Sequence, residues 1–206
     1  MTKKSSGAGR PRTPAIDEAL VAAFQELITE NPLLQLSVRA LAERAGTTRD
    51  AFYRRYVSLG HFLIEVMLGR YAVDPSEDTG SLAGDLRVTQ RAQREMYTDP
   101  IAVGLIPLVL DACFRDPIAA EALSTRFIRP QREAVKRILD RAVARGEIAP
   151  VADPDFVVDQ LYSPMLFRAT LPGMAPIDEA YEQTIVSSVL RGLGAEEDAH
   201  TEGNRP

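Results

Sequence analysis

The sequence has few residues that could hold a metal or form a disulfide. Its 206 residues include one cysteine, Cys113, and two histidines, His61 and His200. A single cysteine excludes an internal disulfide and a cysteine-rich metal site. We interpret Cys113, next to Phe114, as a packed thiol rather than a redox sensor. His61 and Glu65 are four residues apart, but two ligands are too few for a metal site. The sequence therefore indicates no metal and no cofactor.

Long apolar runs and recognisable catalytic patterns are also missing. No stretch approaches the roughly 20 consecutive apolar residues of a membrane helix, and residues 1–14 are polar and basic, unlike a secretory signal. We therefore expect a cytoplasmic protein with no membrane partner. No Ser/His/Asp, HExxH, paired-carboxylate or phosphate-loop pattern occurs. The alternative hypothesis of a helical enzyme is therefore disfavoured, and only turnover of a bound ligand would support it.

Charge is distributed unevenly along a chain whose net charge is −5. Residues 1–56 carry nine Lys/Arg against six Asp/Glu, whereas residues 57–206 carry 15 against 23. A basic N-terminal end on an acidic body favours phosphate binding at that end and keeps the body away from nucleic acid.

Apolar residues recur at helical spacing through most of the chain, and we find no strand pattern and no internal repeat. We therefore predict an all-α fold of about nine helices. Their starts are marked by Ser, Thr or Asp caps and by first-turn prolines. The first four are expected to begin at Pro14, Ser37, Thr47 or Thr48, and Ser58, and the others to span 81–98, 101–114, 117–145, 154–170 and 176–193. Pro107, Pro130 and Pro164 should bend the helices that contain them.

Residues 37–56 have the pattern of a helix-turn-helix. Gly46 occupies the turn between the two short helices, where a positive φ is expected. The positions expected to face the core are Val38, Leu41, Ala45, Phe52 and Tyr56. The outer face of the second helix, the part that enters a major groove, then carries Thr47, Thr48, Arg49, Tyr53 and Arg54.

From Ile16 to about Tyr71 the sequence resembles the DNA-binding domain of TetR-family repressors. The residues that match the family pattern in order and spacing are Leu41-Ala42, Ala45-Gly46 and Tyr53-Arg54-Arg55-Tyr56. In the C-terminal half, residues 141–148, Asp153-Pro154 and residues 190–193 resemble a TetR-type ligand domain. The expected organisation is a disordered basic arm (1–13), a three-helix DNA-binding domain (14–57), a helical effector-binding and dimerisation domain (58–194) and a disordered tail (195–206).

The resemblance implies DNA-contacting roles for several side chains. Arg49 and Thr47 are assigned to base edges, and Thr48 either to helix capping or to a phosphate. Tyr53, Arg54 and Arg39 are assigned to the DNA backbone. Gly9-Arg10-Pro11-Arg12 resembles a minor-groove hook, in which Arg10 and Arg12 would lie along an A·T-rich groove. An ordinary basic tail is the alternative for this segment.

Two positions depart from the family pattern. Asp50 stands where a small residue, often glycine, is usual, and Leu59 stands where a lysine is common. A carboxylate at Asp50 suits the start of a helix but repels phosphate. These departures support another reading, a helical interaction or ligand-binding protein with a degenerate DNA-binding domain.

The resemblance also implies a two-fold homodimer, in which the last two helices of each subunit form a four-helix bundle. The residues expected at this interface are Met165, Arg168, Ile177, Tyr181, Ile185 and Ser188. A purely intramolecular core is the alternative.

An effector cavity is expected among the helices of the body. Met and aromatic side chains suit an irregular apolar pocket, with Gln160 as a polar anchor. The residues proposed to line it are Met67, Tyr71, Met96, Phe114, Phe127, Gln160, Tyr162 and Phe167; ordinary core is the alternative for each.

The sequence thus predicts a DNA-binding transcriptional regulator that is not an enzyme. The expected partners are a palindromic double-stranded operator, a second copy of the chain and a small, apolar or amphipathic effector that releases a repressor from DNA. Whether the outcome is repression or activation depends on operator position and stays open at this point.

Overall fold

The computed structural model describes residues 14–31, 36–72 and 78–195. These residues form helices joined by turns, and none of them is in a strand, which confirms the all-α prediction. They divide into two compact units, Met1–Val57 and Ser58–Pro206, which we call unit 1 and unit 2.

Unit 1 contains three helices, α1 (Pro14–Glu30), α2 (Val38–Arg44) and α3 (Arg49–Tyr53). Ser37 caps α2 and Thr48 caps α3, each accepting a hydrogen bond from the backbone N–H three residues later. Of the two threonines predicted as possible caps of this helix, Thr47 and Thr48, it is therefore Thr48 that caps α3. Gly46 lies in the turn between α2 and α3 with φ of 62°, a conformation that favours glycine.

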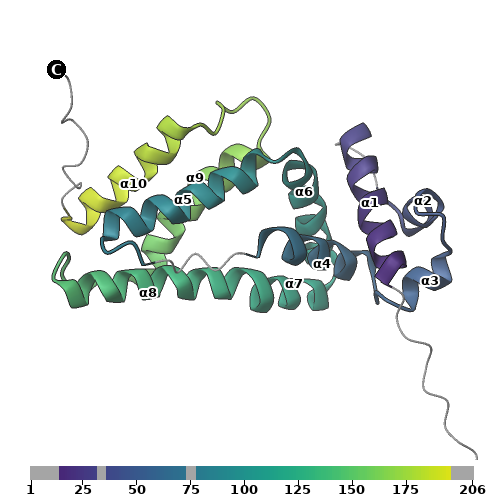
Figure 1. Ribbon diagram of the computed structural model, residues 1–206, viewed down its shortest axis with the longest axis horizontal. Helices are drawn as coiled ribbons and strands as arrows, with labels where there is room; N and C mark the ends of the chain where they lie inside the picture. The colour runs from purple at the N-terminus through teal and green to yellow at the C-terminus, as the bar shows by residue number, and fades with distance from the viewer. Residues whose placement is uncertain (1–13, 32–35, 73–77, 196–206) are drawn as a thin grey trace, which may run out of the picture. The chain divides into compact units, whose positions relative to one another are not determined.

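The core of unit 1 is built from the inward faces of these helices. α2 packs against both α1 and α3 (Figure 1). The fully buried apolar side chains are Leu20, Phe24, Ile28, Leu41 and Phe52. Three helices, two of them short, hold a fixed arrangement because they bury these apolar side chains against one another.

Unit 2 contains the remaining helices. They are α4 (Leu59–Tyr71), α5 (Leu82–Thr98), α6 (Pro100–Arg115), α7 (Pro117–Leu123), the π-helical turn η1 (Ser124–Ile128), α8 (Arg129–Arg145), α9 (Pro154–Thr170) and α10 (Glu179–Leu193). Asp99, Asp116 and Asp153 cap the helices that begin with proline, as the Asp-Pro pairs predicted.

The helix predicted over 117–145 is a continuous run of α7, η1 and α8. The π turn ends at Ile128, two residues before Pro130, whose missing N–H disturbs regular α-helical bonding. Taken as one helix, this run brings the number in the described residues to nine. The last helix begins at Glu179 rather than at 176, because the Asp178 side chain accepts the Tyr181 N–H and fixes the cap there.

α5 is the central helix of unit 2. It packs against α6, α8, α9 and α10, and Figure 1 shows it running beside α10. Its buried face carries leucines and also polar side chains, namely Asp85, Thr89, Gln90 and Gln93. Buried polar groups need hydrogen-bond partners or a ligand. This face of α5 is therefore a candidate wall of a ligand site.

Within the described part of the chain, no single helix has both the length and the apolar composition needed to cross a membrane. α5 and α6 pass that test only as a pair, and they are bent by 84° relative to each other at their junction.

Candidate DNA-binding surface and ligand cavity

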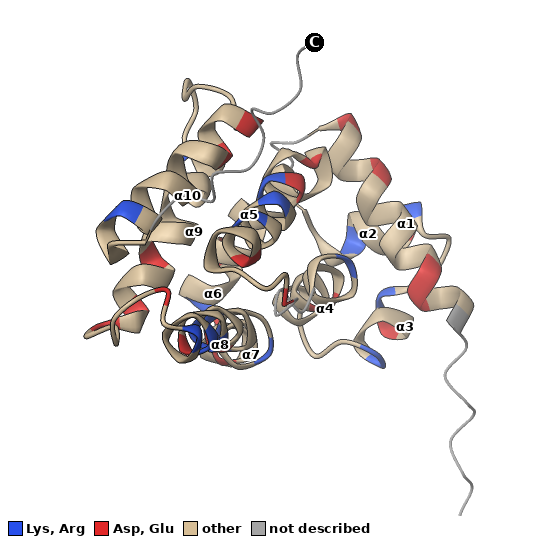
Figure 2. Ribbon diagram, turned by 60° about the vertical axis from the view of Figure 1, so that its left-hand side comes forward, with Lys and Arg blue, Asp and Glu red and all other residues tan. Residues whose placement is uncertain are grey.

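The outward side of α3 carries the residues assigned to DNA. Arg49 and Arg54 are exposed, and neither forms an ion pair with a described residue; Tyr53 is 48% exposed. The Thr48 hydroxyl oxygen accepts the Ala51 N–H at 3.1 Å. Asp50 is exposed beside Arg49, and Figure 2 shows acidic and basic positions together on α3. α3 therefore offers two arginines and a tyrosine to a partner.

The other residues assigned to DNA have different surroundings. Arg39 on α2 is exposed, and its Nε lies 2.8 Å from a carboxylate oxygen of Glu43 one turn away. Thr47 is half-buried. Arg10 and Arg12 lie outside the described residues. Exposed pairs such as Arg39 and Glu43 contribute little to stability, so Arg39 can exchange its partner at low cost.

Two arginines of the basic end have structural partners. Arg44 on α2 holds α1 through Glu30 at 2.7 Å and Glu26 at 3.3 Å. Arg55 lies 3.1 Å from Asp17 of α1, and only 10% of its side chain is exposed. These contacts tie α2 and the end of α3 to α1, so the charge available to a partner is smaller than the sequence count implies.

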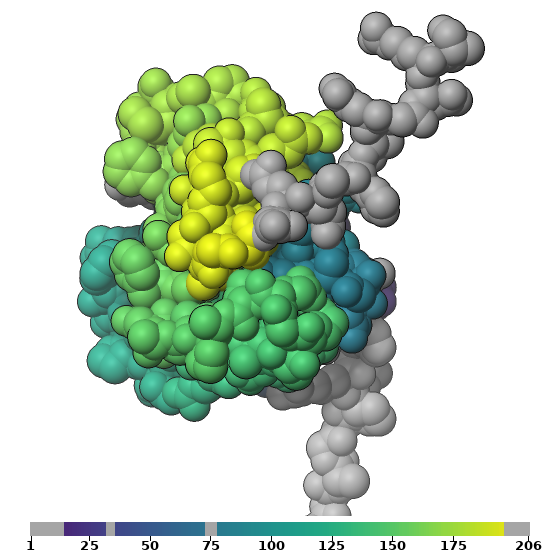
Figure 3. All heavy atoms as spheres, turned by 90° about the vertical axis from the view of Figure 1, so that its left-hand side faces the viewer, coloured from purple at the N-terminus to yellow at the C-terminus, as the bar shows by residue number. Residues whose placement is uncertain are grey.

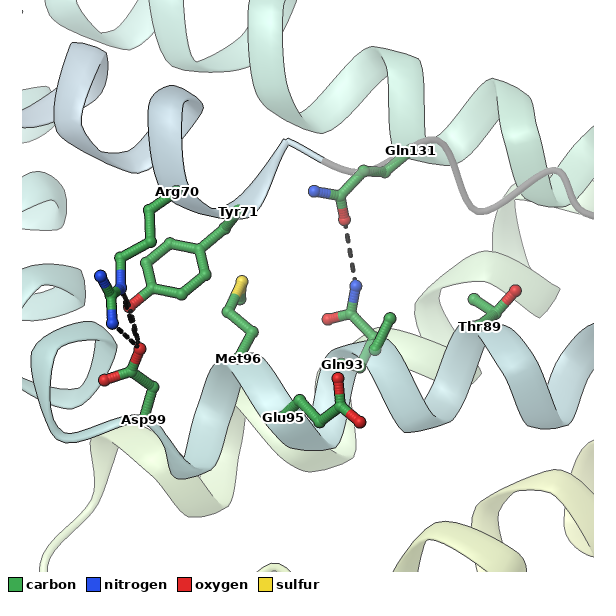
Figure 4. Close-up of a pocket in the computed structure, with 9 residues that line it drawn as sticks. Arg70, Tyr71, Thr89, Gln93, Glu95, Met96, Asp99 and Gln131 are labelled. Carbon is green, nitrogen blue, oxygen red and sulfur yellow. Dashed lines mark hydrogen bonds and ion pairs between the residues drawn. The ribbon is translucent and has the colours of Figure 1, made fainter.

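Unit 2 contains a cavity of about 430 Å³ between the end of α4, α5 and α8 (Figure 4). The residues that line it are Arg70, Tyr71, Thr89, Ala92, Gln93, Glu95, Met96, Asp99 and Gln131. Its volume lies in the range of small-molecule sites.

One end of the cavity is formed by an interconnected group of three polar side chains. Arg70 Nε and the Tyr71 hydroxyl each donate to the same carboxylate oxygen of Asp99, both at 2.9 Å. The other Asp99 oxygen accepts the Ile101 N–H at 2.9 Å. Burial alone would raise the pKa of Asp99, but these hydrogen bonds and the Arg70 charge lower it. Burial, together with the hydrogen bond to Asp99, raises the pKa of Tyr71 to about 12.

Further along the cavity, two glutamines from different helices meet. Gln93 of α5 donates from Nε2 to Oε1 of Gln131 of α8 at 3.1 Å. In Figure 4 the Met96 side chain lies between this pair and the Arg70, Tyr71 and Asp99 group. The cavity therefore has polar groups at both ends and an apolar middle.

Comparison with known proteins accords with this architecture. A family profile described as "Tetracyclin repressor-like, C-terminal domain" matches residues 76–189, more than half of the chain. The chain belongs to the TetR family. It is a DNA-binding transcriptional regulator and not an enzyme.

Individual relatives of this TetR-family regulator cover almost its whole length. The HTH-type transcriptional regulator YdeS of Bacillus subtilis (strain 168) is 26% identical over 189 residues, which are 91% of this chain and 94% of YdeS. The crystal structure of the TetR family transcription regulator SCO0332 has a TM-score of 0.63 at 24% identity, covering 87% of this chain and 98% of the other. The SmeT–triclosan complex has a TM-score of 0.68 at 19% identity, covering 93% and 97%.

The cavity of the regulator contains only part of the set proposed from the sequence. Tyr71 and Met96 line it. Met67 and Phe127 are buried elsewhere in the core, and Tyr162 is half-buried. For three residues the predicted place in the cavity is wrong. Phe114 is 90% exposed, Phe167 is 57% exposed and Gln160 is also exposed, and none of them lines the cavity.

The polar residues of the cavity were not predicted, because Met and aromatic side chains were taken as the mark of a pocket. A signal for them was present in α5. Leu82, Leu86, Thr89, Gln93 and Met96 follow helical spacing on one buried face. Polar residues at core positions of an amphipathic helix need hydrogen-bond partners. On that ground the sequence could have predicted Thr89 and Gln93 as residues that line a polar cavity.

Two residues proposed for the dimer interface also need correction. Met165 is 0% exposed and Ile185 is 5% exposed, because both pack inside unit 2. Arg168 and Tyr181 contact each other, with the guanidinium carbon 3.3 Å from the ring centroid. Ser188 on α10 is exposed and Ile177 is half-buried. The available surface therefore excludes Met165 and Ile185.

Proposed function

We propose that this regulator is a homodimeric repressor that a small molecule, bound in the cavity of unit 2, releases from a palindromic operator. The observation that carries the proposal is the division of α3 into two faces. Ala51 and Phe52 are buried in unit 1, whereas Arg49, Tyr53 and Arg54 are exposed. A short helix presented in this way suits insertion into a major groove.

On DNA, Arg49 and Thr47 read base edges, and Tyr53, Arg54 and Arg39 hold the backbone. A bidentate arginine–guanine contact discriminates between bases by about 1–3 kcal/mol. Thr48 is assigned to the cap of α3, since its hydroxyl already accepts a backbone N–H. Arg10 and Arg12 add minor-groove contacts whose contribution falls with salt.

Dimerisation uses the outer surfaces of α9 and α10. Phe156, Leu166 and Phe167 on α9 are exposed apolar side chains, and Ser188 on α10 is exposed. Figure 3 shows α10, in yellow, at the surface of unit 2. Apolar side chains gathered on one helix favour a protein partner. A two-fold dimer would bring its recognition helices to half-sites about 34 Å apart, one turn of DNA.

The effector is amphipathic in this proposal, since Met96 and Ala92 share the cavity with polar groups. The solved structure of SmeT, which has the same fold, is a complex with triclosan. Release of DNA requires that the effector bind the DNA-free arrangement more tightly than the DNA-bound one. A compound that binds without changing operator affinity is not an effector.

Selection of binding sites from random DNA tests the proposal, followed by titration of the best site at two salt concentrations. We expect a palindrome whose affinity falls steeply with salt. Arg49→Ala should lower affinity for it about tenfold or more. Arg115→Ala in unit 2, an exposed arginine paired with Asp111, is the matched control and should leave affinity unchanged. No enrichment at low salt would contradict the proposal and favour a degenerate DNA-binding domain.

A further inference from the structure

Two carboxamides in the cavity keep hydrogen-bonding capacity that none of the described residues uses. After Gln93 has donated to Gln131 at 3.1 Å, Oε1 of Gln93 and Nε2 of Gln131 have no other hydrogen-bond partner among the described residues. In Figure 4 these two atoms lie on the same side of the bond, toward Met96 and Tyr71. The pair therefore presents an acceptor and a donor to the same region of the cavity.

This presentation does not depend on how the two amides are oriented. Rotating both carboxamides by 180° would reverse the bond, so that Gln131 donates to Gln93. Gln93 would then present its nitrogen and Gln131 its oxygen. In both arrangements one donor lies beside one acceptor, and the complementary ligand group has an acceptor beside a donor.

The charged groups of the cavity give little to a charged ligand. Asp99 already receives hydrogen bonds from Arg70, Tyr71 and the Ile101 N–H. An anion would have to compete with Asp99 for Arg70 and would also face Glu95, which lines the cavity and is exposed. A cation at Asp99 would have to displace Arg70, and its other carboxylate partner, Glu95, is exposed, where water weakens an ion pair. An uncharged ligand avoids both costs.

We propose that the cavity binds an uncharged ligand with a cis-amide group, such as a lactam or a cyclic imide. Its carbonyl oxygen and N–H pair with Gln131 and Gln93, and its apolar ring lies against Met96 and Tyr71. The proposal rests on the assignment of this cavity as the effector site. Gln93 is only 7% exposed. A ligand without a donor for its amide oxygen therefore forgoes one hydrogen bond and also leaves a buried polar atom unsatisfied, which lowers affinity further.

Calorimetric titration of the full-length protein with oxindole and phthalimide tests the ligand class. Each compound is compared with its N-methyl derivative, which keeps the carbonyl and loses the donor. We expect both parent compounds to bind and each N-methyl derivative to bind at least about fivefold more weakly, since a buried polar group left without its partner lowers affinity by that factor or more. Benzoate and benzamidine, of similar size, supply the anionic and cationic comparisons and should bind more weakly than either parent.

Variants locate the binding on the two glutamines. Gln93→Leu and Gln131→Leu should each remove the preference for the parent compound over its N-methyl derivative. Gln25→Leu in α1 of unit 1 is the matched control and should keep that preference. The comparison of ligands on the unchanged protein holds even where a leucine variant fails to fold. Equal binding of parent and N-methyl compounds, stronger binding of benzoate or benzamidine, or no binding of either parent up to its solubility limit would overturn the proposal.

The same titrations, repeated with operator DNA present, separate this inference from the proposed function. Lactams that bind through the glutamines without releasing DNA would support the ligand class and contradict the effector role of the cavity. Release of DNA by a charged compound that occupies the cavity would support the effector role and overturn the ligand class.

Discussion

The Nε of Arg94 lies 2.6 Å from a carboxylate oxygen of Glu182, which joins α5 to α10. Glu182 is only 4% exposed. Arg94 directly precedes Glu95 and Met96, both of which line the cavity. One helix therefore carries a wall of the cavity and an ion pair to the last helix. A displacement of α5 by a ligand would act on α10 through this contact.

Removal of one partner from this pair should be costly. Arg94→Leu leaves the Glu182 carboxylate buried without its cation, and we expect it to lower the free energy of unfolding by about 2–3 kcal/mol. Adding Glu182→Leu should restore much of the loss, because no buried charge remains. Urea denaturation measures both changes, with the exposed Arg115→Leu as control. A double variant as unstable as Arg94→Leu alone would contradict this account.

Gly60 should resist replacement more than Gly69, although both lie in α4. A Cβ added at Gly60 would lie 3.0 Å from the Cβ of Ala112 in α6 and 3.3 Å from that of Ala119 in α7, whereas one at Gly69 would meet nothing within 4 Å. Gly69→Ala should raise the free energy of unfolding by roughly 0.5–1 kcal/mol through helix propensity. Gly60→Ala should lower it by about 1 kcal/mol, because overpacking outweighs that gain. Thermal unfolding of the two variants gives the comparison, and an equal stabilisation by both would show that α4 can move away from α6 without cost.

The Tyr162 hydroxyl is buried and has no hydrogen-bond partner among the described residues, and burial raises the pKa of Tyr162. Tyr162→Phe removes an unsatisfied polar atom, so stability should stay unchanged or rise by up to about 1 kcal/mol. Tyr71→Phe loses the 2.9 Å bond to Asp99 and should cost about 1 kcal/mol. Chemical denaturation distinguishes the two substitutions, and a clear loss of stability from Tyr162→Phe would mean that its hydroxyl has a partner such as bound water.

Stability should depend on pH through Asp85, which is 0% exposed. Burial alone would raise its pKa, but the N–H and hydroxyl of Thr79, both at 2.7 Å, and Arg141 at 3.0 Å lower it below the ordinary 3.8. A lowered pKa in the folded state gives stability that is complete well above pH 3.8 and is lost as the pH falls below that value and through the lower pKa of the folded state.

The free energy of unfolding should therefore fall as the pH is lowered from about 5, and Asp85→Asn should make this fall shallower. Asp111→Asn, at an exposed pair with Arg115, is the control and should keep the slope. Guanidinium titrations at several pH values measure it, and an unchanged slope in Asp85→Asn would assign the acid sensitivity to other groups.

The sequence alone determined the helical fold and the positions of most helix ends. Capping by Ser37, Thr48 and Ser58, and the Asp-Pro starts of α6 and α9, need only contacts within a few residues. Local hydrogen bonds are fixed by local sequence, and so these predictions succeeded. The helix-turn-helix pattern also depends on residues close together in the sequence, and it indicated the TetR family.

Only the tertiary structure decided which side chains share a cavity or a surface. Arg70 and Asp99 are 29 residues apart, and Gln93 and Gln131 are 38 apart, so no spacing within one helix brings them together. Ile185 shares the helical periodicity of Tyr181 and Ser188 that is expected of an interface, yet Ile185 is buried within its own chain, as is Met165. Phe114 is an aromatic residue of the kind that lines apolar pockets, but its side chain is exposed. Periodicity shows that a helix has an apolar face, but which element covers that face depends on long-range packing.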